Sequence, residues 1–438
     1  MVVILPPTLL PLFQRRQCRN RSSLHRHLGE GLQRCKRIGC RHLDYNSPVA
    51  KVIVAELWYR TFVGKFYFAD PSMSNGLPQS QRAVPEDSSL QLYAFGSNGE
   101  GQLGTPAAEI VNTPTRVLHF TTDVCPLPLD ELKYIRGGDN HTLFLTKRGV
   151  IYGIGDNRKG QLRREKSQLR IESFHILALN NSFAAATCES SAYVELVSNL
   201  PYSEVKIHGS NSWGELGSRD NGLSMLEVPG CIVDFTAGVW HYVAIMQDGS
   251  VYGWGKARLG QLGDALTDKV TKPTKIEGIS FKPKTAVCGK DFTYLVSDPA
   301  EGKHLLLGKD KFNIISNMPE HVKNWKDIGA TWHAIFVLFE DGTLTAWGKE
   351  NMWKLLPPNL PLLDKIAVGS DHILAVTKEG KLISWGWGKH GNCGDLSNIR
   401  VEMKNDMVSG FWNEIRIPGE IQMIGAGYCT SFVVTKQA

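Results

Sequence analysis

One glycine-rich block recurs along most of this chain and limits the folds that it can adopt. The clearest copies are YAFGSNGEGQLG from Tyr93, VYGWGKARLGQLG from Val251 and WGWGKHGNCG from Trp385. Seven apolar runs end in a glycine, and these glycines are Gly96, Gly155, Gly209, Gly255, Gly308, Gly348 and Gly386. Their successive spacings are 59, 54, 46, 53, 40 and 38 residues. A repeat of about 40–50 residues is typical of one propeller blade of roughly four short strands. We therefore expect an all-β fold, a seven-bladed β-propeller over residues 90–438.

A hairpin pattern precedes most of these glycines. It occurs at 141–155, 241–255, 333–348 and 372–386, where two apolar or aromatic runs flank a tight turn. Two of the turns contain an Asp-Gly pair, at 248–249 and 341–342. Asp-Gly tolerates the positive φ angles of a two-residue hairpin turn, so the pattern predicts antiparallel strands joined by such turns.

The two ends of the repeat region complete each other. Residues 91–96 resemble the second strand of a hairpin without its first strand, and residues 428–434 resemble a first strand without its second. We expect these halves to pair and to close the ring, because closure removes the unpaired sheet edges that promote aggregation.

Residues 1–89 differ in character from the repeats. Residues 1–88 contain 13 Lys and Arg against 6 Asp and Glu, a net charge of +7, whereas the remaining residues contain 36 against 37, a net charge of −1. The positive charge of the chain is therefore no evidence for a propeller that binds nucleic acid. We expect a disordered basic extension with a polar linker at 71–89.

The extension itself has several interpretations. The Arg-rich and Ser-rich start, with no acidic residue before Glu30, is typical of a mitochondrial transit peptide, but three prolines by position 11 disfavour its helix. A basic arm that binds DNA is a second interpretation, and a dispensable or wrongly predicted extension, with Met73 as a later start, is the third.

Nine cysteines are scattered along the chain, and none forms a C-x-x-C pair. This usage fits reduced thiols in the cytoplasm or nucleus and predicts no metal site and no cofactor. No apolar run reaches about 18 residues, so we expect no transmembrane helix.

Four histidines follow a glycine by three or four residues at the start of the hairpins. They are His141, His241, His333 and His372, whereas Phe292 and Thr430 replace histidine in two other copies. A metal or acid-base role would require these side chains to meet, but repeat-equivalent positions are distributed around a ring. We therefore predict that they are structural and bond backbone groups between blades.

The glycine-rich turns also have two interpretations. Gly386, Gly388 and Gly391 match G-x-G-x-x-G, yet a dinucleotide site needs a preceding strand and a following helix, and a polar stretch follows instead. We predict that Gly96, Gly255 and Gly386 serve the structure of the repeat through positive φ or close backbone approach.

Residues that break the repeat are the candidates for binding a partner. Trp240 and Trp332 precede repeat histidines, and Trp387 and His390 lie in a glycine-rich turn, as does Trp213. A residue that blade packing requires should recur, whereas a residue found in one blade is free to contact a partner, and tryptophan is a common interface anchor. The alternative is that these indoles pack between blades. We predict a partner-binding site of Trp240, Trp332, Trp387 and His390.

The repeated GQLG and G-x-x-H blocks resemble the regulator of chromosome condensation family of seven-bladed propellers over about residues 90–438. Within it, WGWGKHGNCG at 385–394 and YAFGSNGEGQLG at 93–104 are similar to the fungal branch of alpha-tubulin suppressors, also called killer-toxin insensitivity proteins. This resemblance implies an adaptor or regulator that forms a heterodimer with a small CSL-type zinc- or iron-binding protein. It also implies support for diphthamide synthesis and for Elongator-dependent modification of wobble uridine in tRNA, with Elongator itself as a possible further partner.

The founding branch of the family implies a different function, nucleotide exchange on the GTPase Ran. The copies at 304–316 and 344–357 depart from that pattern, and the chain has no obvious counterpart of the inserted hairpin wedge used for exchange. An enzyme with its own active site is a third possibility, but no nucleophile, base and orienting acid can be placed together. We expect a non-enzymatic protein in cytoplasm and nucleus that binds neither nucleic acid nor membrane directly.

A shortened chain that begins at Met73 is expected to be as soluble and as active in complementation as the full chain, because no repeat element precedes that residue. Solubility, melting temperature and complementation check this prediction. Loss of activity by a shortened chain that still folds would identify the extension as a targeting or binding signal.

Overall fold

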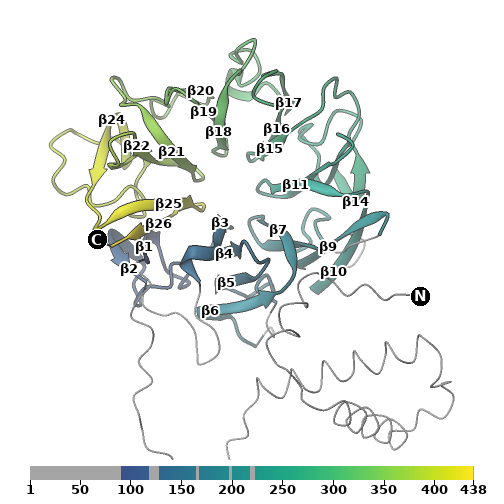
Figure 1. Cartoon of the computed structure of the whole chain (residues 1–438), viewed down its shortest axis with the longest axis horizontal. Helices are drawn as coiled ribbons and strands as arrows, with labels where there is room; N and C mark the ends of the chain where they lie inside the picture. The colour runs from purple at the N-terminus through teal and green to yellow at the C-terminus, as the bar shows by residue number, and fades with distance from the viewer. Residues whose placement is uncertain (1–89, 118–127, 164–166, 197–199, 218–221, 438) are drawn as a thin grey trace, which may run out of the picture. The chain divides into compact units, whose positions relative to one another are not determined.

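The computed structural model describes residues 90–117, 128–163, 167–196, 200–217 and 222–437. The predictions for the extension and linker at 1–89 lie outside these residues. The described residues form seven antiparallel sheets arranged around a central axis (Figure 1). The predicted seven-bladed β-propeller is therefore confirmed.

Blades 1 to 3 have four strands each. Blade 1 contains β3 (Leu132–Gly137), β4 (His141–Thr146), β5 (Ile151–Asp156) and β6 (Arg170–Ala178). Blade 2 contains β7 (Asn181–Ala186), β8 (Ser190–Glu195), β9 (Tyr202–Gly209) and β10 (Gly222–Pro229). Blade 3 contains β11 (Ile232–Ala237), β12 (His241–Met246), β13 (Val251–Lys256) and β14 (Lys269–Lys275). The first strand of each blade lies nearest the axis and the fourth lies outermost (Figure 1).

Blades 4 and 5 have only three described strands each, fewer than the repeat predicts. Blade 4 contains β15 (Thr285–Cys288), β16 (Phe292–Val296) and β17 (His304–Gly308), and blade 5 contains β18 (Trp325–Ala330), β19 (Ala334–Phe339) and β20 (Leu344–Gly348). The 3₁₀ turn η3 (Lys311–Asn313) follows β17, and Pro357, Pro358 and Pro361 follow β20. Prolines lack the N–H that a further ladder strand would donate, which explains the missing strand of blade 5.

The last two blades complete the ring. Blade 6 contains β21 (Leu363–Val368), β22 (His372–Thr377), β23 (Leu382–Trp387) and β24 (Met407–Ile415), and blade 7 contains β25 (Glu420–Ala426), β26 (Thr430–Lys436), β1 (Leu90–Ser97) and β2 (Ile110–Arg116). A second 3₁₀ turn, η2 (Leu129–Glu131), precedes β3. Strands β26 and β1 pair with Tyr93 opposite Val433 and Gly96 opposite Thr430, so the predicted closure is confirmed.

The hairpin turns differ from the prediction in length. In blade 3 the amide of Met246 donates to the carbonyl of Ser250 (2.9 Å), so residues 247–249 form a three-residue loop. Only Gly249 has positive φ (93°), while the Asp248 carboxylate accepts the amide of Ser250 (2.9 Å). The Asp-Gly pair therefore belongs to a type I turn followed by a left-handed glycine, the other common way to close a hairpin.

Three histidines join neighbouring blades. His141, His241 and His372 are buried at the start of the second strands of blades 1, 3 and 6. Each Nε2 lies 3.0 Å from a hydroxyl of the next blade, which belongs to Ser191, Thr293 and Ser431 respectively. Thr293 and Ser431 in turn donate to the backbone carbonyls of Gln261 (2.7 Å) and Asn392 (2.8 Å). The ring therefore reaches the backbone through a hydroxyl, not directly as the sequence predicts.

Burial, and not these bonds, keeps the three histidines neutral. Because the Thr293 hydroxyl gives its proton to a carbonyl, His241 must donate from Nε2, and Nδ1 carries no proton. The Nδ1 atoms are buried, and no described residue accepts or donates a hydrogen bond to them. Burial lowers the pKa of His241 to about 3 and the pKa values of His141 and His372 to about 4.

The fourth predicted histidine has a different position. In blade 5 the register pairs Gly348 with Ala334, whereas Gly255 pairs with His241 in blade 3. His333 therefore occupies the position of Trp240, one residue before the repeat histidine, and Thr331 occupies the position of Gly238. The assignment of His333 to the repeat histidines, preceded by Gly329, was wrong by one residue.

The three repeat glycines named above meet the start of the second strand. Gly96, Gly255 and Gly386 have φ angles of 124°, 102° and 102°. A Cβ atom on them would lie 2.3–2.5 Å from the carbonyl oxygens of Cys429, Trp240 and Asp371 respectively. Both the positive φ and this close approach disfavour any side chain at these positions.

Deleting residues 428–438 is expected to abolish the cooperative thermal transition. The deletion removes β26 from between β1 and β25 and exposes the partners of Phe432, Val433 and Val434, which are at most 2% exposed. Calorimetry should compare this chain with one that lacks only residues 437–438. A melting curve like that of the full chain would contradict the closure.

Replacing His241 with Gln should reduce the sensitivity of stability to acid. The unfolded chain protonates this histidine near pH 6.5 and the folded chain only near pH 3, so the free energy of unfolding falls as the pH drops below 6.5. One such histidine contributes about 1.4 kcal/mol per pH unit in this window. Urea unfolding at pH 7, 6 and 5 should show the gap between wild type and His241→Gln shrinking as the pH falls. Parallel curves would refute a neutral buried histidine.

Candidate protein-binding face

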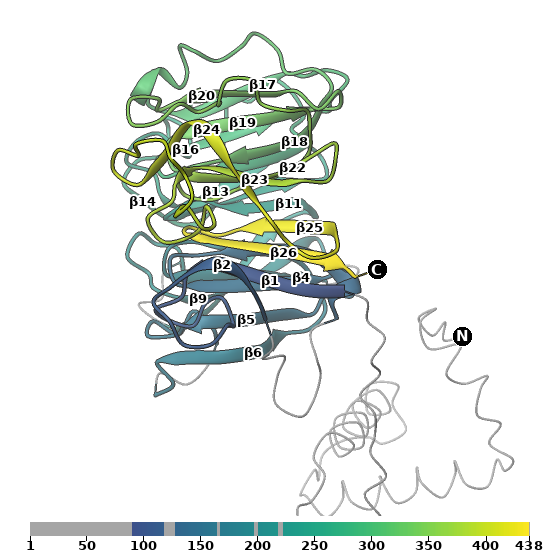
Figure 2. The ribbon, with the colours of Figure 1, turned by 90° about the vertical axis from the view of Figure 1, so that its left-hand side faces the viewer.

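Two sets of loops emerge at one end of the propeller, which we call the loop face. One set joins the first and second strands of the blades and comprises 138–140, 187–189, 238–240, 289–291, 331–333, 369–371 and 427–429. The other set follows the third strands, and because Gly255 pairs with His241, loop 257–268 begins beside loop 238–240. Leu90 and Lys436 pair at the other end, which we call the hairpin face (Figure 2).

Backbone hydrogen bonds connect the first set of loops around the axis. The second residue of a loop donates its N–H to the carbonyl of the second residue in the next blade. Five such bonds of 2.8–3.1 Å occur among the described residues: Asp139 to Cys188, Cys188 to Val239, Lys290 to Trp332, Trp332 to Ser370 and Ser370 to Tyr428. These bonds hold the loops together and position the side chains that they carry.

Trp332 belongs to this inner ring of loop residues. Its indole contacts the Tyr428 ring edge to face at 5.5 Å, and the ammonium group of Lys290 lies 5.2 Å from the indole centroid. The indole Nε1 and the Tyr428 hydroxyl are buried, and neither has a hydrogen-bond partner among the described side chains and backbone. Burial raises the pKa of Tyr428 well above 10. Both residues line the central channel at its loop-face end.

The central channel is lined by the first strands of all seven blades and has a volume of about 430 Å³. Its polar side chains bind neighbouring blades. The Asp234 carboxylate accepts from the Thr285 hydroxyl (2.6 Å) and the Ala286 amide (2.9 Å), and the Ala184 amide donates to the Tyr134 hydroxyl (2.8 Å). These groups are occupied by inter-blade contacts, so the channel serves the fold more directly than a ligand.

The other three predicted contacts also lie on the loop face, but in different blades. Trp240 is half-buried in blade 3, one residue from the inner ring. In blade 6 the His390 ring meets the Trp387 indole edge to face at 5.0 Å. The pKa of His390 is lowered by burial and by Lys389, while Asp139 of blade 1 opposes this shift. The structure thus brings Trp387 and His390 together and places Trp240 and Trp332 separately from them.

A basic and aromatic surface covers blades 2 to 5 of the loop face. The Trp213 ring lies 5.2–5.7 Å from the cationic groups of Lys256, Arg258 and Lys269. Further along, Lys311 and Lys349 flank Phe312 at 5.2 and 5.3 Å. Such pairs contribute about 0.5–1 kcal/mol each at exposed sites. Tyr428, Lys290 and Phe312 are not among the residues predicted from the sequence. Aligning the loops by strand register places Lys290 and Tyr428 at the position of Trp332.

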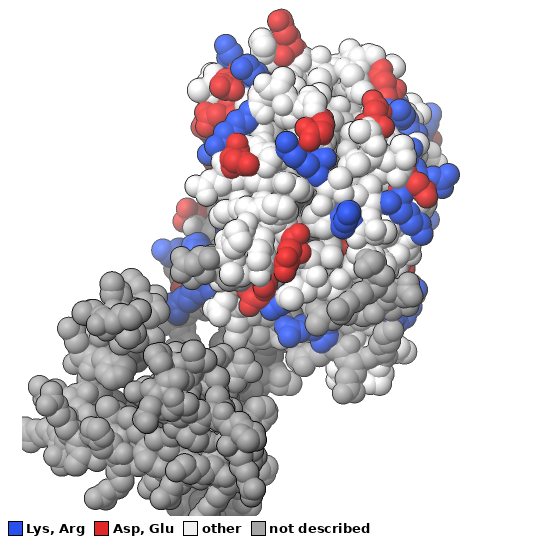
Figure 3. All heavy atoms as spheres, turned by 90° about the vertical axis from the view of Figure 1, so that its right-hand side faces the viewer, with Lys and Arg blue, Asp and Glu red and all other residues white. Residues whose placement is uncertain are grey.

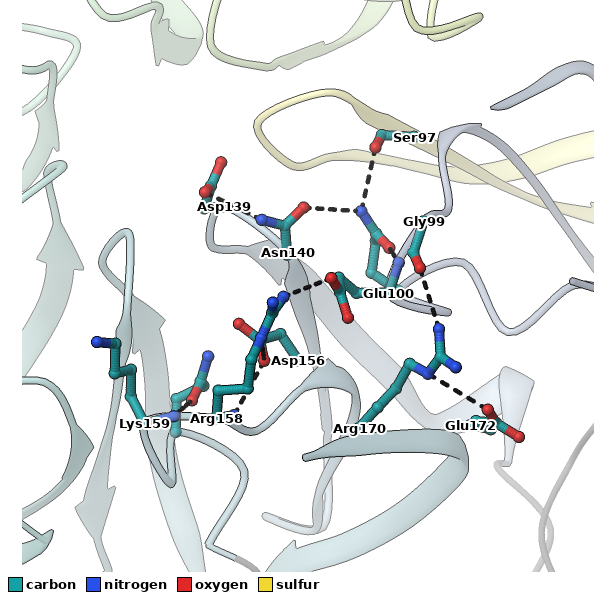
Figure 4. A network of polar contacts seen from close by, with 12 residues as sticks. Ser97, Gly99, Glu100, Asp139, Asn140, Asp156, Arg158, Lys159, Arg170 and Glu172 are labelled. Carbon is teal, nitrogen blue, oxygen red and sulfur yellow. Dashed lines mark hydrogen bonds and ion pairs between the residues drawn. The ribbon is translucent and has the colours of Figure 1, made fainter. Parts of the chain in front are cut away.

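The loop face over blades 7 and 1 has the opposite character, with carboxylates that are already paired (Figure 4). Arg158 binds Asp156 (Nε to Oδ1 2.9 Å) and also forms an ion pair with Glu100. The amide of Gln102 bridges the Ser97 hydroxyl and the Asn140 carbonyl oxygen, both at 3.2 Å. On the outer side drawn in Figure 3, both signs of charge are interspersed. The cation–aromatic contacts described above thus belong to blades 2 to 5, whereas blades 7 and 1 carry ion pairs.

Within the described ranges, no three side chains of His, Cys, Asp or Glu gather as a metal site requires. The same residues include no helix with the length and apolarity needed to cross a bilayer.

Comparisons of sequence identify the repeat. Two models of the regulator of chromosome condensation (RCC1) repeat match this chain, one at 91–145 and 248–296 and the other at 133–161, 232–261 and 364–392. An RCC1 repeat-containing protein of Schizosaccharomyces pombe is 27% identical over 372 residues, which cover 79% of this chain and 99% of the relative. The secretion-regulating guanine nucleotide exchange factor of Bos taurus is 26% identical over 389 residues, which cover 74% of this chain and 79% of that protein.

Solved structures agree on the fold. Prp20p of Saccharomyces cerevisiae superposes with a TM-score of 0.65 at 20% identity and covers 80% of this chain and 92% of its own. Human WBSCR16 gives a TM-score of 0.62 at 18% identity and covers 80% of this chain and 99% of its own. The matched repeats, the related sequences and the seven blades lead to one conclusion: the chain is a seven-bladed β-propeller that carries RCC1 repeats.

Proposed function

We propose that this protein is a non-catalytic adaptor whose loop face binds a small CSL-type zinc- or iron-binding protein. The proposal rests on one observation: residues that recur in the repeat and residues that do not recur lie in different places. The side chains of the repeat histidines are buried between blades, whereas Trp240, Trp387 and His390, which do not recur, lie on the loop face. A rigid ring that carries unlike side chains on one face suits recognition of a partner protein.

The identity of the partner rests on the resemblance of WGWGKHGNCG to the alpha-tubulin suppressor branch. That stretch forms the end of β23 and the turn after it, where Trp387 meets His390. In this role the heterodimer supports diphthamide synthesis and Elongator-dependent modification of wobble uridine in tRNA, in cytoplasm and nucleus, and Elongator is a possible further partner. Redox chemistry would belong to the metal protein, which the propeller would hold or shield.

Nucleotide exchange on a Ran-type GTPase is the second candidate function. It is favoured by the similarity to a secretion-regulating guanine nucleotide exchange factor and by the fold shared with Prp20p, whose structure was described with its binding properties to Gsp1p and histones. The described strands all belong to the seven blades, so none of them is the inserted hairpin wedge that exchange would use.

Replacing Trp240 or Trp387 with alanine should weaken binding of the purified CSL-type protein by about 30- to 1000-fold, or roughly 2–4 kcal/mol, if the indole is a central anchor. Trp412→Ala is the matched control, because it removes a half-buried indole from the outer strand β24. Titration calorimetry of the pair measures the effect, alongside nucleotide release from Ran.

The outcomes separate the two functions. If a variant with alanine at Trp240, Trp332, Trp387 and His390 still binds the CSL-type protein, the proposed binding site is wrong and the proposed partner is retained. If the propeller stimulates nucleotide release from Ran and does not bind the metal protein, its function is nucleotide exchange and not that of an adaptor.

A further inference from the structure

A pocket of about 390 Å³ opens on the loop face between blades 3, 4 and 5. It is distinct from the four predicted partner contacts, none of which lines it. Its walls come from the loops of three neighbouring blades, and the lining residues are Leu259, Asp291, Phe292, Lys309, Asp310, Lys311, Phe312, Ile314 and His333.

The pocket exists because the repeat has decayed in blade 4. In blade 3 the loop after the third strand is filled from within, since Gln261 accepts the amide of Leu259 (2.8 Å) and Leu262 is fully buried. Blade 4 has KDKFNI after Gly308 in place of this Gln-Leu pair. Blade 5 has also lost the pair, but Trp353 is buried there and stacks on Phe336. In blade 4 the Ile314 side chain is buried, and the pocket remains beside it.

Phe312 stands at the rim of this pocket in an unfavourable backbone conformation. Its φ and ψ angles are 62° and 27°, a left-handed conformation that costs a residue with a Cβ atom about 1–2 kcal/mol. The ring remains half-buried and meets the His333 ring at 5.2 Å. Strain of this kind in a loop is typical of binding sites, where the surrounding structure holds a side chain in place for a ligand.

The rim carries two lysines and one exposed carboxylate, that of Asp310. Lys311 and Lys349 lie beside the Phe312 ring and form no ion pair within the described chain. Of the acidic groups in the pocket, Asp291 binds Lys256 (3.0 Å). Asp310 accepts the amide of Ile315 (2.7 Å) and remains ionised, because its hydrogen bonds lower its pKa. Burial first, and then Lys349, Lys311 and Lys290, lowers the pKa of His333 to about 4, so His333 adds no charge at neutral pH.

We propose that this pocket binds an acidic peptide segment of a partner protein. An apolar side chain of the segment enters against Leu259, Phe292 and Ile314, and flanking carboxylates pair with Lys311 and Lys349. The inference rests on the proposed function in taking the loop face as the partner-binding surface, and it adds a second contact with its own chemistry. A single-stranded nucleic acid would use the same lysines and the Phe312 ring. It fits less well because Phe312 is a single half-buried ring, and the apolar walls at Leu259, Phe292 and Ile314 suit an aliphatic side chain.

The test uses a short fluorescein-labelled peptide with a central leucine flanked by aspartates and glutamates, measured by fluorescence anisotropy on the full chain. Wild type should bind it, and Lys311→Gln with Lys349→Gln should weaken binding on the order of tenfold or more. The matched control is Lys282→Gln with Lys284→Gln, which removes the same charge where Lys282 lies beside Gly249 on the hairpin face. This control should bind like wild type.

Phe312→Asn separates binding from folding. Asparagine tolerates the left-handed conformation, so the melting temperature should not fall, while loss of the ring should weaken peptide binding on the order of tenfold. Equal peptide binding by wild type and the double lysine variant, or no binding by wild type, would overturn the proposal. If an oligothymidylate binds this pocket and the peptide does not, the ligand of the pocket is a nucleic acid and not an acidic peptide.

These outcomes are independent of the metal protein. If the CSL-type protein binds and the peptide does not, the pocket proposal fails and the proposed function stands. If the peptide binds and the CSL-type protein does not, the adaptor assignment fails and the chemistry of the pocket stands.

Discussion

At three of the seven junctions between blades, one short polar link joins a histidine ring to a hydroxyl of the next blade. The ring fits only because a glycine lies three residues before it: a Cβ atom on Gly238 would lie 2.3 Å from the His241 ring. Blade 5 has Thr331 at the glycine position and Ala334 at the ring position, and the Ala334 amide donates to the Thr331 hydroxyl (2.9 Å). Glycine with a ring and threonine with a small residue are therefore alternative solutions for the same loop.

The fold could be predicted because each repeat carries local signals of strand, turn and register. The half-hairpins at 91–96 and 428–434 predict that the two ends pair, and the structure gives the register, with Tyr93 opposite Val433. The error at His333 was avoidable. His141, His241 and His372 each precede their paired glycines by 14 residues, whereas His333 precedes Gly348 by 15, and this extra residue marks the change of register. The length of the hairpin loops was harder to predict, because Asp-Gly is compatible with both two-residue and three-residue loops.

The candidate site was less predictable, because binding residues are defined by what they do not share with other blades. Departure from the repeat selects residues that lie on the loop face. It could not distinguish Trp332, whose indole nitrogen is buried beside the channel, from Trp240 on the same face. Nor could it identify Phe312, since the loop around it no longer resembles the repeat. Its position depends on a left-handed backbone and on two lysines, one of them in the next blade. Contacts of this kind are set by the three-dimensional arrangement of blades.

The backbone bonds around the channel mouth have a consequence for how such a protein can change. The bonds use only amide and carbonyl groups, so they do not depend on which side chain each loop carries. In this chain the seven equivalent positions hold Asp139, Cys188, Val239, Lys290, Trp332, Ser370 and Tyr428. Acidic, basic, aliphatic, aromatic and thiol groups thus share one scaffold position. The side chains at this end of the channel can therefore be substituted one at a time, while the backbone that carries them keeps its geometry.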